Sequence, residues 1–319
     1  MNRRSISDTS SSRGPNSKRD DADASEPSGP SALRKPAGGL HIVATPIGNL
    51  EDLTLRARKT LASVDLIACE DTRVTRKLLS AYGLSTPVVA YHDHNAARMR
   101  PRLIERLKNG QSMALVTDAG TPLVADPGFK LVRAALDAGL PVTALPGPSA
   151  GLTALLLSGL PSDRFLFAGF LPPKQGARRT ALGEWRALRA SLIFFESPRR
   201  LAASLADMLS ELGDRPAAVA RELTKRYEEV RRGTLSELGD HYRSRGAPKG
   251  EVVVVVGPAA AGREAMGEAE TDALLGEALA RVGTRQAAAE LAERTGRSRR
   301  ELYRRALALR SGKEAEGDG

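Results

Sequence analysis

The sequence predicts an α/β fold: two α/β domains followed by a small helical domain. Three observations support this prediction. Apolar runs of strand length alternate with segments of helical periodicity, which is typical of α/β domains with a largely parallel sheet. A Leu-Pro-Ser-Asp break at residues 160–163 divides the alternation into two blocks, and the segment from residue 271 to residue 310 has a purely helical pattern. The 319 residues suffice for two ordinary domains and a small appendage.

The first domain is expected over residues 37–160, after a Ser-, Asp- and Pro-rich tail at residues 1–36 that is expected to be disordered. Its first strand, residues 40–45, is a buried apolar run stopped by Pro46 and Gly48. Further strands are expected at residues 65–69, 114–117 and 141–145, and helices at residues 53–64, 72–82, 129–138 and 150–157.

The second domain is expected over residues 161–258. Strands are predicted at residues 165–169, 192–195, 217–220 and 252–256, and helices at residues 181–188 and 199–212. Small residues at 258–267 are typical of a linker. The helical domain is expected over residues 268–312, where helices at 286–293 and 299–309 flank a short turn.

Composition narrows the classes of function. Lysine and arginine outnumber aspartate and glutamate by 48 to 38, and the resulting net charge of +10 favours a polyanionic partner. Cys69 is the only cysteine, which excludes an internal disulfide and a Cys/His zinc cluster and favours a reducing compartment. No apolar run reaches membrane-spanning length and no signal-peptide pattern begins the chain, so a soluble cytoplasmic protein with no membrane association is expected.

Glycine- and proline-rich loops follow the predicted strands of the first domain. Parallel sheets bind ligands at the carboxyl ends of their strands, where glycine lets the backbone approach a ligand closely. Each loop alone is more simply a turn, but four in one domain favour a binding site. The fingerprints of dinucleotide-binding, P-loop and His-Glu-x-x-His zinc proteins are absent. The loops are Thr45-Pro-Ile-Gly-Asn-Leu50, Thr117-Asp-Ala-Gly-Thr-Pro122, Asp126-Pro-Gly128 and Pro146-Gly-Pro-Ser-Ala150.

A resemblance to a known family rests on ten short motifs in order along the chain. They are Ile42-Val-Ala-Thr-Pro-Ile-Gly-Asn-Leu50, Ala68-Cys-Glu-Asp-Thr-Arg73, Tyr91-His-Asp-His-Asn95, Leu115-Val-Thr-Asp-Ala-Gly-Thr-Pro122, Asp126-Pro-Gly128, Leu145-Pro-Gly-Pro-Ser-Ala150, Phe167-Ala-Gly-Phe-Leu-Pro172, Phe195-Glu-Ser-Pro198, Arg221-Glu-Leu-Thr-Lys225 and Lys249-Gly-Glu251. The chain resembles the tetrapyrrole-methylase-like family, in its ribosomal RNA branch, over residues 40–257. The tetrapyrrole-methylating branch usually has Gly-x-Gly-Pro-Gly-Asp in the first loop, and this chain departs from it.

The resemblance implies two α/β domains with S-adenosylmethionine in the cleft between them. It further implies 2′-O-methylation of a cytidine in small-subunit ribosomal RNA at the decoding centre, with ribosomal RNA or the small ribosomal subunit as partner and a homodimeric state. A sulfonium with a zwitterionic tail suits backbone groups and an acid such as Asp118. The cofactor residues that the motifs imply are Pro46, Gly48, Asp118, Gly120, Thr121, Asp126, Gly147, Ala150, Phe170, Glu196 and Glu251.

Methyl transfer to a ribose hydroxyl depends on alignment and on a proton acceptor, because the hydroxyl is a weak nucleophile. Glu70 and Asp71 also suit the first turn of a helix, where acids act as caps. His92 and His94 resemble a metal-binding pair, but no third ligand is evident and no metal is expected. The proton acceptor therefore stays open within the candidate catalytic set, which comprises Glu70, Asp71, Arg73, His92, His94 and Lys225.

Basic side chains outside these motifs are candidate RNA contacts. The segment from Arg297 to Arg310 carries six arginines and one glutamate in a helical pattern, which suits the RNA backbone but equally suits a solvated helical face. The candidate set comprises Arg178, Arg179, Arg199, Arg226, Arg297, Arg299, Arg300, Arg304 and Arg305. Two other functions stay open: a tetrapyrrole C-methyltransferase, and a non-catalytic RNA-binding or ribosome-assembly protein that retains the fold.

Overall fold

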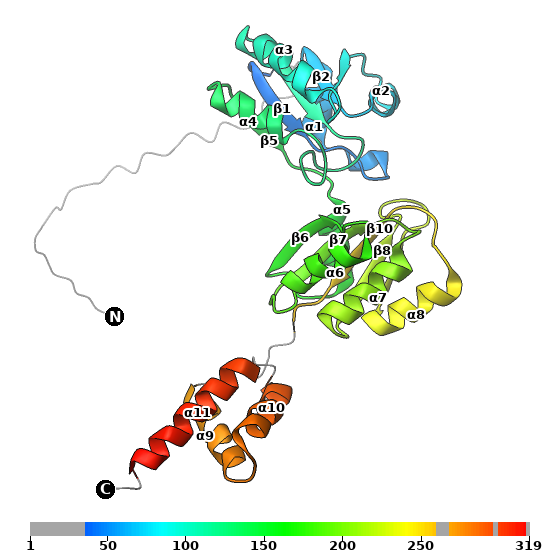
Figure 1. Ribbon diagram of the computed structural model, residues 1–319. Helices are drawn as coiled ribbons and strands as arrows, with labels where there is room; N and C mark the ends of the chain where they lie inside the picture. Colours follow the sequence, from blue (N-terminus) through cyan, green and yellow to red (C-terminus); the bar gives the residue numbers. More distant parts are fainter. Residues whose placement is uncertain (1–35, 260–267, 296–298, 317–319) are drawn as a thin grey trace, which may run out of the picture. The chain divides into compact units, whose positions relative to one another are not determined.

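The computed structural model describes residues 36–259, 268–295 and 299–316 (Figure 1). The tail expected at residues 1–36 lies outside the described residues except for Pro36, so its disorder stays a prediction. Arg297, a candidate RNA contact, also lies outside them. Among the residues that are described, no helix combines the length and apolar character needed to cross a membrane.

The first sheet has five strands and is parallel throughout. Its order is β3-β2-β4-β1-β5, and every neighbouring pair is parallel, as the alternation of strands and helices predicts. All carboxyl ends of these strands therefore lie at one edge, where the glycine- and proline-rich loops begin. The strands are β1 (Gly39–Val43), β2 (Leu66–Cys69), β3 (Val88–Ala90), β4 (Ser112–Val116) and β5 (Val142–Leu145).

Two pairs of helices cover the two faces of this sheet. The strands alternate: Leu66 and Ala68 of β2 belong to one apolar cluster, and Ile67 and Cys69 to the other. Helices α3 (Ala96–Lys108) and α4 (Phe129–Asp137) pack in the first cluster. Helices α1 (Leu55–Ser63) and α2 (Thr72–Ala81) pack in the second, so they form one layer.

The second sheet is mixed, unlike the first. Its order is β6-β7-β10-β8-β9, in which only β6 and β7 are parallel and the other pairs are antiparallel. The all-valine strand β10 is buried at the centre, as its continuous apolar run predicts. The strands are β6 (Phe165–Phe170), β7 (Ser191–Glu196), β8 (Pro216–Arg221), β9 (Glu229–Thr234) and β10 (Val252–Val256).

One face of the second sheet carries α6 (Gln175–Glu184), α7 (Leu201–Leu212) and α8 (Leu235–Arg245). The other face carries α5 (Ala150–Ser158), whose Ala154 and Leu155 pack on the inner side chains of β7, β8 and β10. Ile47, from the loop after β1, belongs to the same apolar cluster. The first loop of the first domain is thus packed into the second domain, and the two α/β domains share a core.

Several elements differ from the sequence-based expectation. Helix α6 begins at Gln175 rather than residue 181, because Arg178 is a buried helical residue whose charge concealed the apolar face. Strands β3 and β9 and helices α3 and α8 were not predicted. Strand β9 is an edge strand of mixed polarity, and α3 carries five cations and an internal Pro101, so neither has a clear apolar pattern.

The helical domain consists of α9 (Glu268–Leu279), α10 (Thr284–Thr295) and α11 (Arg299–Glu316). Its small core is made by leucine and alanine side chains from all three helices, including Leu275, Leu291 and Leu302. Residues 280–283 and 296–298 separate the helices, and the second of these segments lies outside the described residues.

Candidate active site

Backbone hydrogen bonds join the glycine- and proline-rich loops at the carboxyl edge of the first sheet. Thr45 and Gly120 exchange two of them, with N···O distances of 2.9 and 3.0 Å. The Thr45 hydroxyl donates to the Thr117 carbonyl at 3.2 Å, and the Thr121 hydroxyl donates to the Pro148 carbonyl at 3.0 Å. These hydrogen bonds hold the loops after β1, β4 and β5 together at the edge where parallel sheets bind their ligands.

A cavity of about 430 Å³ lies beside these loops and is closed by the second domain. Its lining includes eight of the expected cofactor residues: Asp118, Gly120, Thr121, Asp126, Ala150, Phe170, Glu196 and Glu251. Sequence reasoning missed the apolar and hydroxyl side chains between them, notably Ile47, Thr117, Ser149 and Phe195. All four lie within the motifs quoted above, so their position was available as a signal, but their residue types are not diagnostic of a ligand.

A second cavity, of about 390 Å³, adjoins the first. It holds the remaining expected first-loop residues, Pro46 and Gly48, together with Lys225 and one side of α2. The two cavities share lining residues, among them Thr117, Asp118 and Glu251. A group bound in one cavity can therefore meet a group bound in the other across these residues.

Carboxyl groups concentrate at the first cavity. Burial, with the nearby charges of Glu70 and Asp118, raises the pKa of Asp126 to about 6. Burial also raises the pKa of Glu70 and of Asp118, and neighbouring carboxylates add to the effect in both cases. Such a grouping of acids repels itself in the absence of a cation, which is a common property of binding sites.

Two buried threonine hydroxyls face these cavities without an ordinary partner. Thr117 is 3% exposed and lines both cavities, and Thr75 of α2 is 3% exposed and lines the second. The Thr117 hydroxyl interacts with the Asp126 and Glu70 carboxylates and the Thr75 hydroxyl with the Cys69 thiol, but within the described residues neither contact meets ordinary hydrogen-bond geometry. Both hydroxyls are therefore open to a better-placed polar ligand.

The second domain contributes the strained loop at 222–225. Glu222 and Thr224 have positive φ angles of 50° and 64°, which non-glycine residues rarely adopt outside functional sites. This geometry lets the Thr224 hydroxyl accept from the Asn49 N–H at 3.1 Å. A Cβ atom on Gly48 would lie 2.4 Å from Cγ of Lys225, so only glycine fits at this contact between the domains.

Lys225 lies between two carboxylates. Its Nζ atom is 2.8 Å from Glu251 and 2.9 Å from Glu222. Burial alone would lower the pKa of Lys225, but the hydrogen bonds to these carboxylates outweigh it and the pKa is raised. Lys225 therefore carries a firm positive charge at the second cavity and is not suited to accept a proton.

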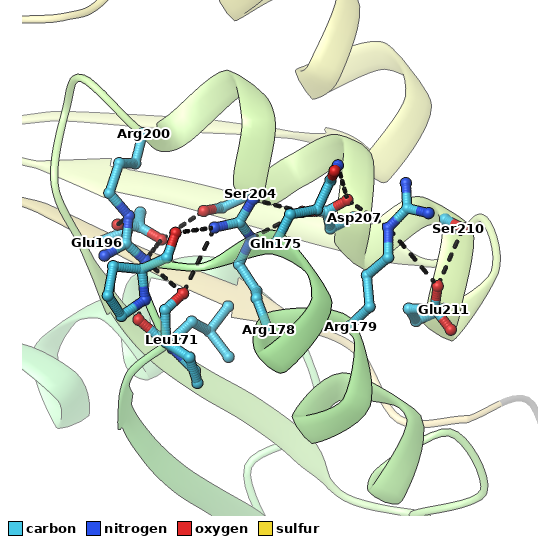
Figure 2. A network of polar contacts seen from close by, with 12 residues as sticks. Leu171, Gln175, Arg178, Arg179, Glu196, Arg200, Ser204, Asp207, Ser210 and Glu211 are labelled. Atoms are coloured by element: carbon cyan, nitrogen blue, oxygen red, sulfur yellow. Dashed lines mark hydrogen bonds and ion pairs between the residues drawn. The ribbon is translucent and has the colours of Figure 1, made fainter.

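A network of arginines and carboxylates supports the loop after β6, which follows Phe170 (Figure 2). Arg200 donates to the Leu171 carbonyl at 2.8 Å and to Glu196 at 3.2 Å. Arg178 donates to the Pro173 carbonyl at 3.2 Å and to Asp207 at 2.7 Å. These contacts connect α6 and α7 with the loop. We call Arg178, Arg179, Glu196, Arg200 and Asp207 the arginine–carboxylate network.

The network bears on two sequence-based expectations, which stay predictions. Arg178 is 5% exposed and its guanidinium is occupied by Asp207 and by backbone carbonyls, so it is not available to an RNA phosphate. Glu196 lines the first cavity, but its carboxylate is bound by Arg200, the Ser204 hydroxyl and a backbone N–H. Its contacts suit loop positioning better than ligand binding. Sequence patterns do not reveal either pairing.

Most of the expected catalytic set lies outside the cavity linings. Asp71 caps α2 and binds Arg73, whose hydrogen bonds lower the pKa of Asp71 to about 2. The rings of His92 and His94 lie 5.9 Å apart. Within the described residues, no three His, Cys, Asp or Glu side chains are grouped as metal ligands.

Gly147, expected at the cofactor, lines neither cavity. A Cβ atom on Gly147 would lie 2.9 Å from the Cβ atom of Ala44.

The other expected RNA contacts are mostly exposed. Arg179 is exposed but bound to Asp207 at 2.7 Å, and Arg305 is paired with Asp272. Arg226 lies over the ring of Tyr227. The remaining expected contacts that the structure describes are exposed on the second domain or on α11: Arg199, Arg299, Arg300 and Arg304.

Comparison with known proteins identifies the family. The profile of the family described as Tetrapyrrole (Corrin/Porphyrin) Methylases matches residues 39–239, and that of the RsmI C-terminal HTH domain matches residues 265–310. The chain is 56% identical over 281 residues to the ribosomal RNA small subunit methyltransferase I of Mesorhizobium japonicum, covering 88% of this chain and 95% of the relative. It is 46% identical over 274 residues to the protein of that name from Escherichia coli O157:H7, covering 85% and 95%.

Solved structures agree on the fold. The chain is similar to the uroporphyrin-III-C-methyltransferase from Thermus thermophilus with a TM-score of 0.51 and 23% identity, covering 69% of this chain and 94% of that one. The chain therefore belongs to the tetrapyrrole methylase family and, within it, to the group of the ribosomal RNA small subunit methyltransferases I, and it is a methyltransferase.

Proposed function

We propose that this enzyme methylates the ribose 2′-oxygen of a cytidine in small-subunit ribosomal RNA, at the decoding centre. The observation that carries the proposal is the pair of adjoining cavities that share Thr117, Asp118 and Glu251. Methyl transfer between two substrates needs two neighbouring binding sites that hold the donor and the acceptor oxygen next to each other and in line. The names of the relatives favour ribosomal RNA as the acceptor.

The first cavity suits S-adenosylmethionine, the cofactor of this methyltransferase family. When bound, that group supplies an electrophilic methyl carried on a sulfonium. Asp118 and Asp126 oppose its positive charge, while Ile47, Phe170 and Phe195 supply apolar surface for the rest of the molecule. Gly120 and Ala150 leave the backbone open to its polar groups. The raised pKa values of the acids fit a site built for a cation.

The second cavity suits the acceptor nucleoside. Asp118 borders both cavities, and its carboxylate is the best-situated acceptor for the proton that leaves the hydroxyl. The Lys225 ammonium, held by Glu222 and Glu251, stabilises negative charge that develops on the attacking oxygen. The charge of Glu70 helps to raise the pKa of Asp126. Asp71 and Arg73 fix the start of α2 beside this cavity, and His92 and His94 lie on the loop after β3.

Assembly and location complete the proposal. Apolar side chains on α4 and α5 are exposed, including Phe129 (68%) and Leu156 (76%), which supports a homodimer. Arg299, Arg300 and Arg304 support RNA contact by the helical domain. Cytoplasmic location follows from the proposed ribosomal substrate.

The test is transfer of labelled methyl from S-adenosylmethionine to small ribosomal subunits that lack their native modifications, followed by nucleoside mass spectrometry. We expect 2′-O-methylcytidine. The Asp118→Asn variant, of nearly equal volume, should lose most transfer and keep its fold by circular dichroism. Label in a base, or in a porphyrinogen in place of RNA, would overturn the proposal.

A further inference from the structure

The helices of the α1–α2 layer carry an unusual charge distribution. Neither helix contains an aspartate or a glutamate, although both are rich in lysine and arginine. Their exposed cations lie on the same layer, because α1 and α2 pack on the same face of the first sheet. We call Arg56, Arg58, Lys59, Arg76 and Lys77 the cationic face.

The cations of this face have no acidic partners. None of the five forms an ion pair with any residue in the described ranges 36–259, 268–295 and 299–316. Arg58 lies 5.7 Å from the ring centroid of Tyr82 at the end of α2, a contact that leaves its charge free and joins the two helices. Glu51 and Asp52, just before α1, act on the Tyr82 hydroxyl together with Arg58, but the five cations outnumber them and create a positive potential that attracts a polyanion.

The cationic face adjoins the second cavity. Lys77 lines that cavity, as do Val74 and Leu50, which are 38% and 48% exposed. The cavity is also lined by Thr75 and Thr117, which are both buried and bring hydroxyl groups to its interior. From surface to interior, a ligand would therefore meet cations, then apolar side chains, then polar groups.

We infer that the RNA strand binds along the cationic face, with its phosphates on these side chains and the target nucleoside in the second cavity. Cations hold the backbone without reading sequence, while a single nucleoside turned out of the strand meets the apolar rim and the two threonine hydroxyls. This inference rests on the proposed function, since it takes RNA as the acceptor. It adds an RNA-binding surface on the first domain to the contact proposed for the helical domain.

The first domain offers a matched control on its opposite face. Helix α3 carries Arg102, Arg106 and Lys108, which are also exposed, but none of them lines either cavity. A triple variant of α3 removes the same charge as a triple variant of the cationic face, so the two variant proteins have equal net charge. Any difference between the variants then reflects location.

The experiment compares R56Q/K59Q/R76Q with R102Q/R106Q/K108Q in binding to small ribosomal subunits at several salt concentrations. The three substituted residues of the cationic face line neither cavity, so affinity for S-adenosylmethionine alone should match that of the wild type in both variants. The first variant should bind subunits at least tenfold more weakly, and the slope of log K against log salt should fall by about 2. The α3 variant should retain the wild-type slope.

A second variant tests the cavity itself. Thr75→Val keeps the volume but removes the hydroxyl, and we expect kcat/KM for subunits to fall about tenfold with unchanged cofactor affinity. An unchanged salt slope in the cationic-face variant, or an equal loss in the α3 variant, overturns the inference while the wild type still methylates RNA. Absence of methyl transfer by the wild type itself would instead reject the proposed function.

Discussion

The cationic face and the arginine–carboxylate network contain the same kind of side chain and use it in opposite ways. In the network, Asp207 is held by two arginines, and its side chain is 1% exposed. On the cationic face, Arg56 and Arg76 are exposed and form no ion pair with another described residue. A run of arginines in the sequence therefore does not identify an RNA contact. The presence of a buried carboxylate partner decides whether an arginine holds the protein together or remains free for a ligand.

The largest expected effect comes from removing the acid at the centre of the network. Asp207→Ala leaves Arg178 buried without a counter-charge, so the free energy of unfolding should fall by about 3–5 kcal/mol. Urea denaturation measures this free energy. A decrease of less than about 1 kcal/mol would mean that the network does not stabilise the fold and that the contrast with the cationic face fails.

A smaller effect should separate loop positioning from stability. Arg200→Lys keeps a positive charge beside Glu196 but loses the second donor to the Leu171 carbonyl. That loop follows Phe170 at the first cavity. Loss of a hydrogen bond worth about 2 kcal/mol should therefore raise KM for S-adenosylmethionine roughly thirtyfold, while kcat changes less. Equal falls in kcat and kcat/KM would assign Arg200 a role in the transition state instead. Arg199→Lys, at the exposed neighbouring residue, is the matched control.

The acids of the arginine–carboxylate network and of the first cavity should respond to pH in opposite directions. Burial would raise the pKa of Asp207, but bonds to Arg179 and Arg178 outweigh it and lower the pKa, so its stabilisation is present above the unfolded value and is lost as pH falls through the folded value. Asp126 has its pKa raised to about 6, so its contribution to stability is present at low pH and is lost as pH rises through 6.

Cofactor binding should follow the ionised form of Asp126, because its carboxylate opposes a cation. Affinity for S-adenosylmethionine should be about tenfold weaker at pH 5 than at pH 7, as one group with a pKa near 6 requires. Isothermal titration calorimetry measures this, and Asp126→Asn should flatten the profile. A profile that keeps its pH dependence in that variant would assign the titration to another group, such as Glu70.

The smallest effect is expected at an exposed ion pair. Arg133 and Asp137 of α4 lie 2.9 Å apart with side chains 68% and 57% exposed. Arg133→Ala should change the free energy of unfolding by no more than about 0.5 kcal/mol. Comparable losses for Arg133→Ala and Asp207→Ala in the same urea assay would show that burial does not distinguish the two pairs.

Much of the secondary structure of the first domain could be predicted from the sequence, because each strand is marked by a short stretch of neighbouring residues. Parallel strands buried on both faces appear as short apolar runs, so β1, β2 and β4 were predictable. The motif loops likewise indicated Asp118, Asp126 and Gly48. Thr75 and Lys77 were not predictable, because they are ordinary residues of an amphipathic helix until the fold sets that helix beside a cavity.

By itself, the sequence determined the α/β class, the loops at the strand ends, the methyltransferase family and the excess of positive charge. Each of these depends on residues near one another in the chain or on total composition. Only the tertiary structure decided which charges are neutralised, because Arg178 and Asp207 are 29 residues apart and meet only when α6 packs on α7. It also decided that α1 and α2 share one layer, since period-two alternation in β2 and β4 places their packing residues on one face.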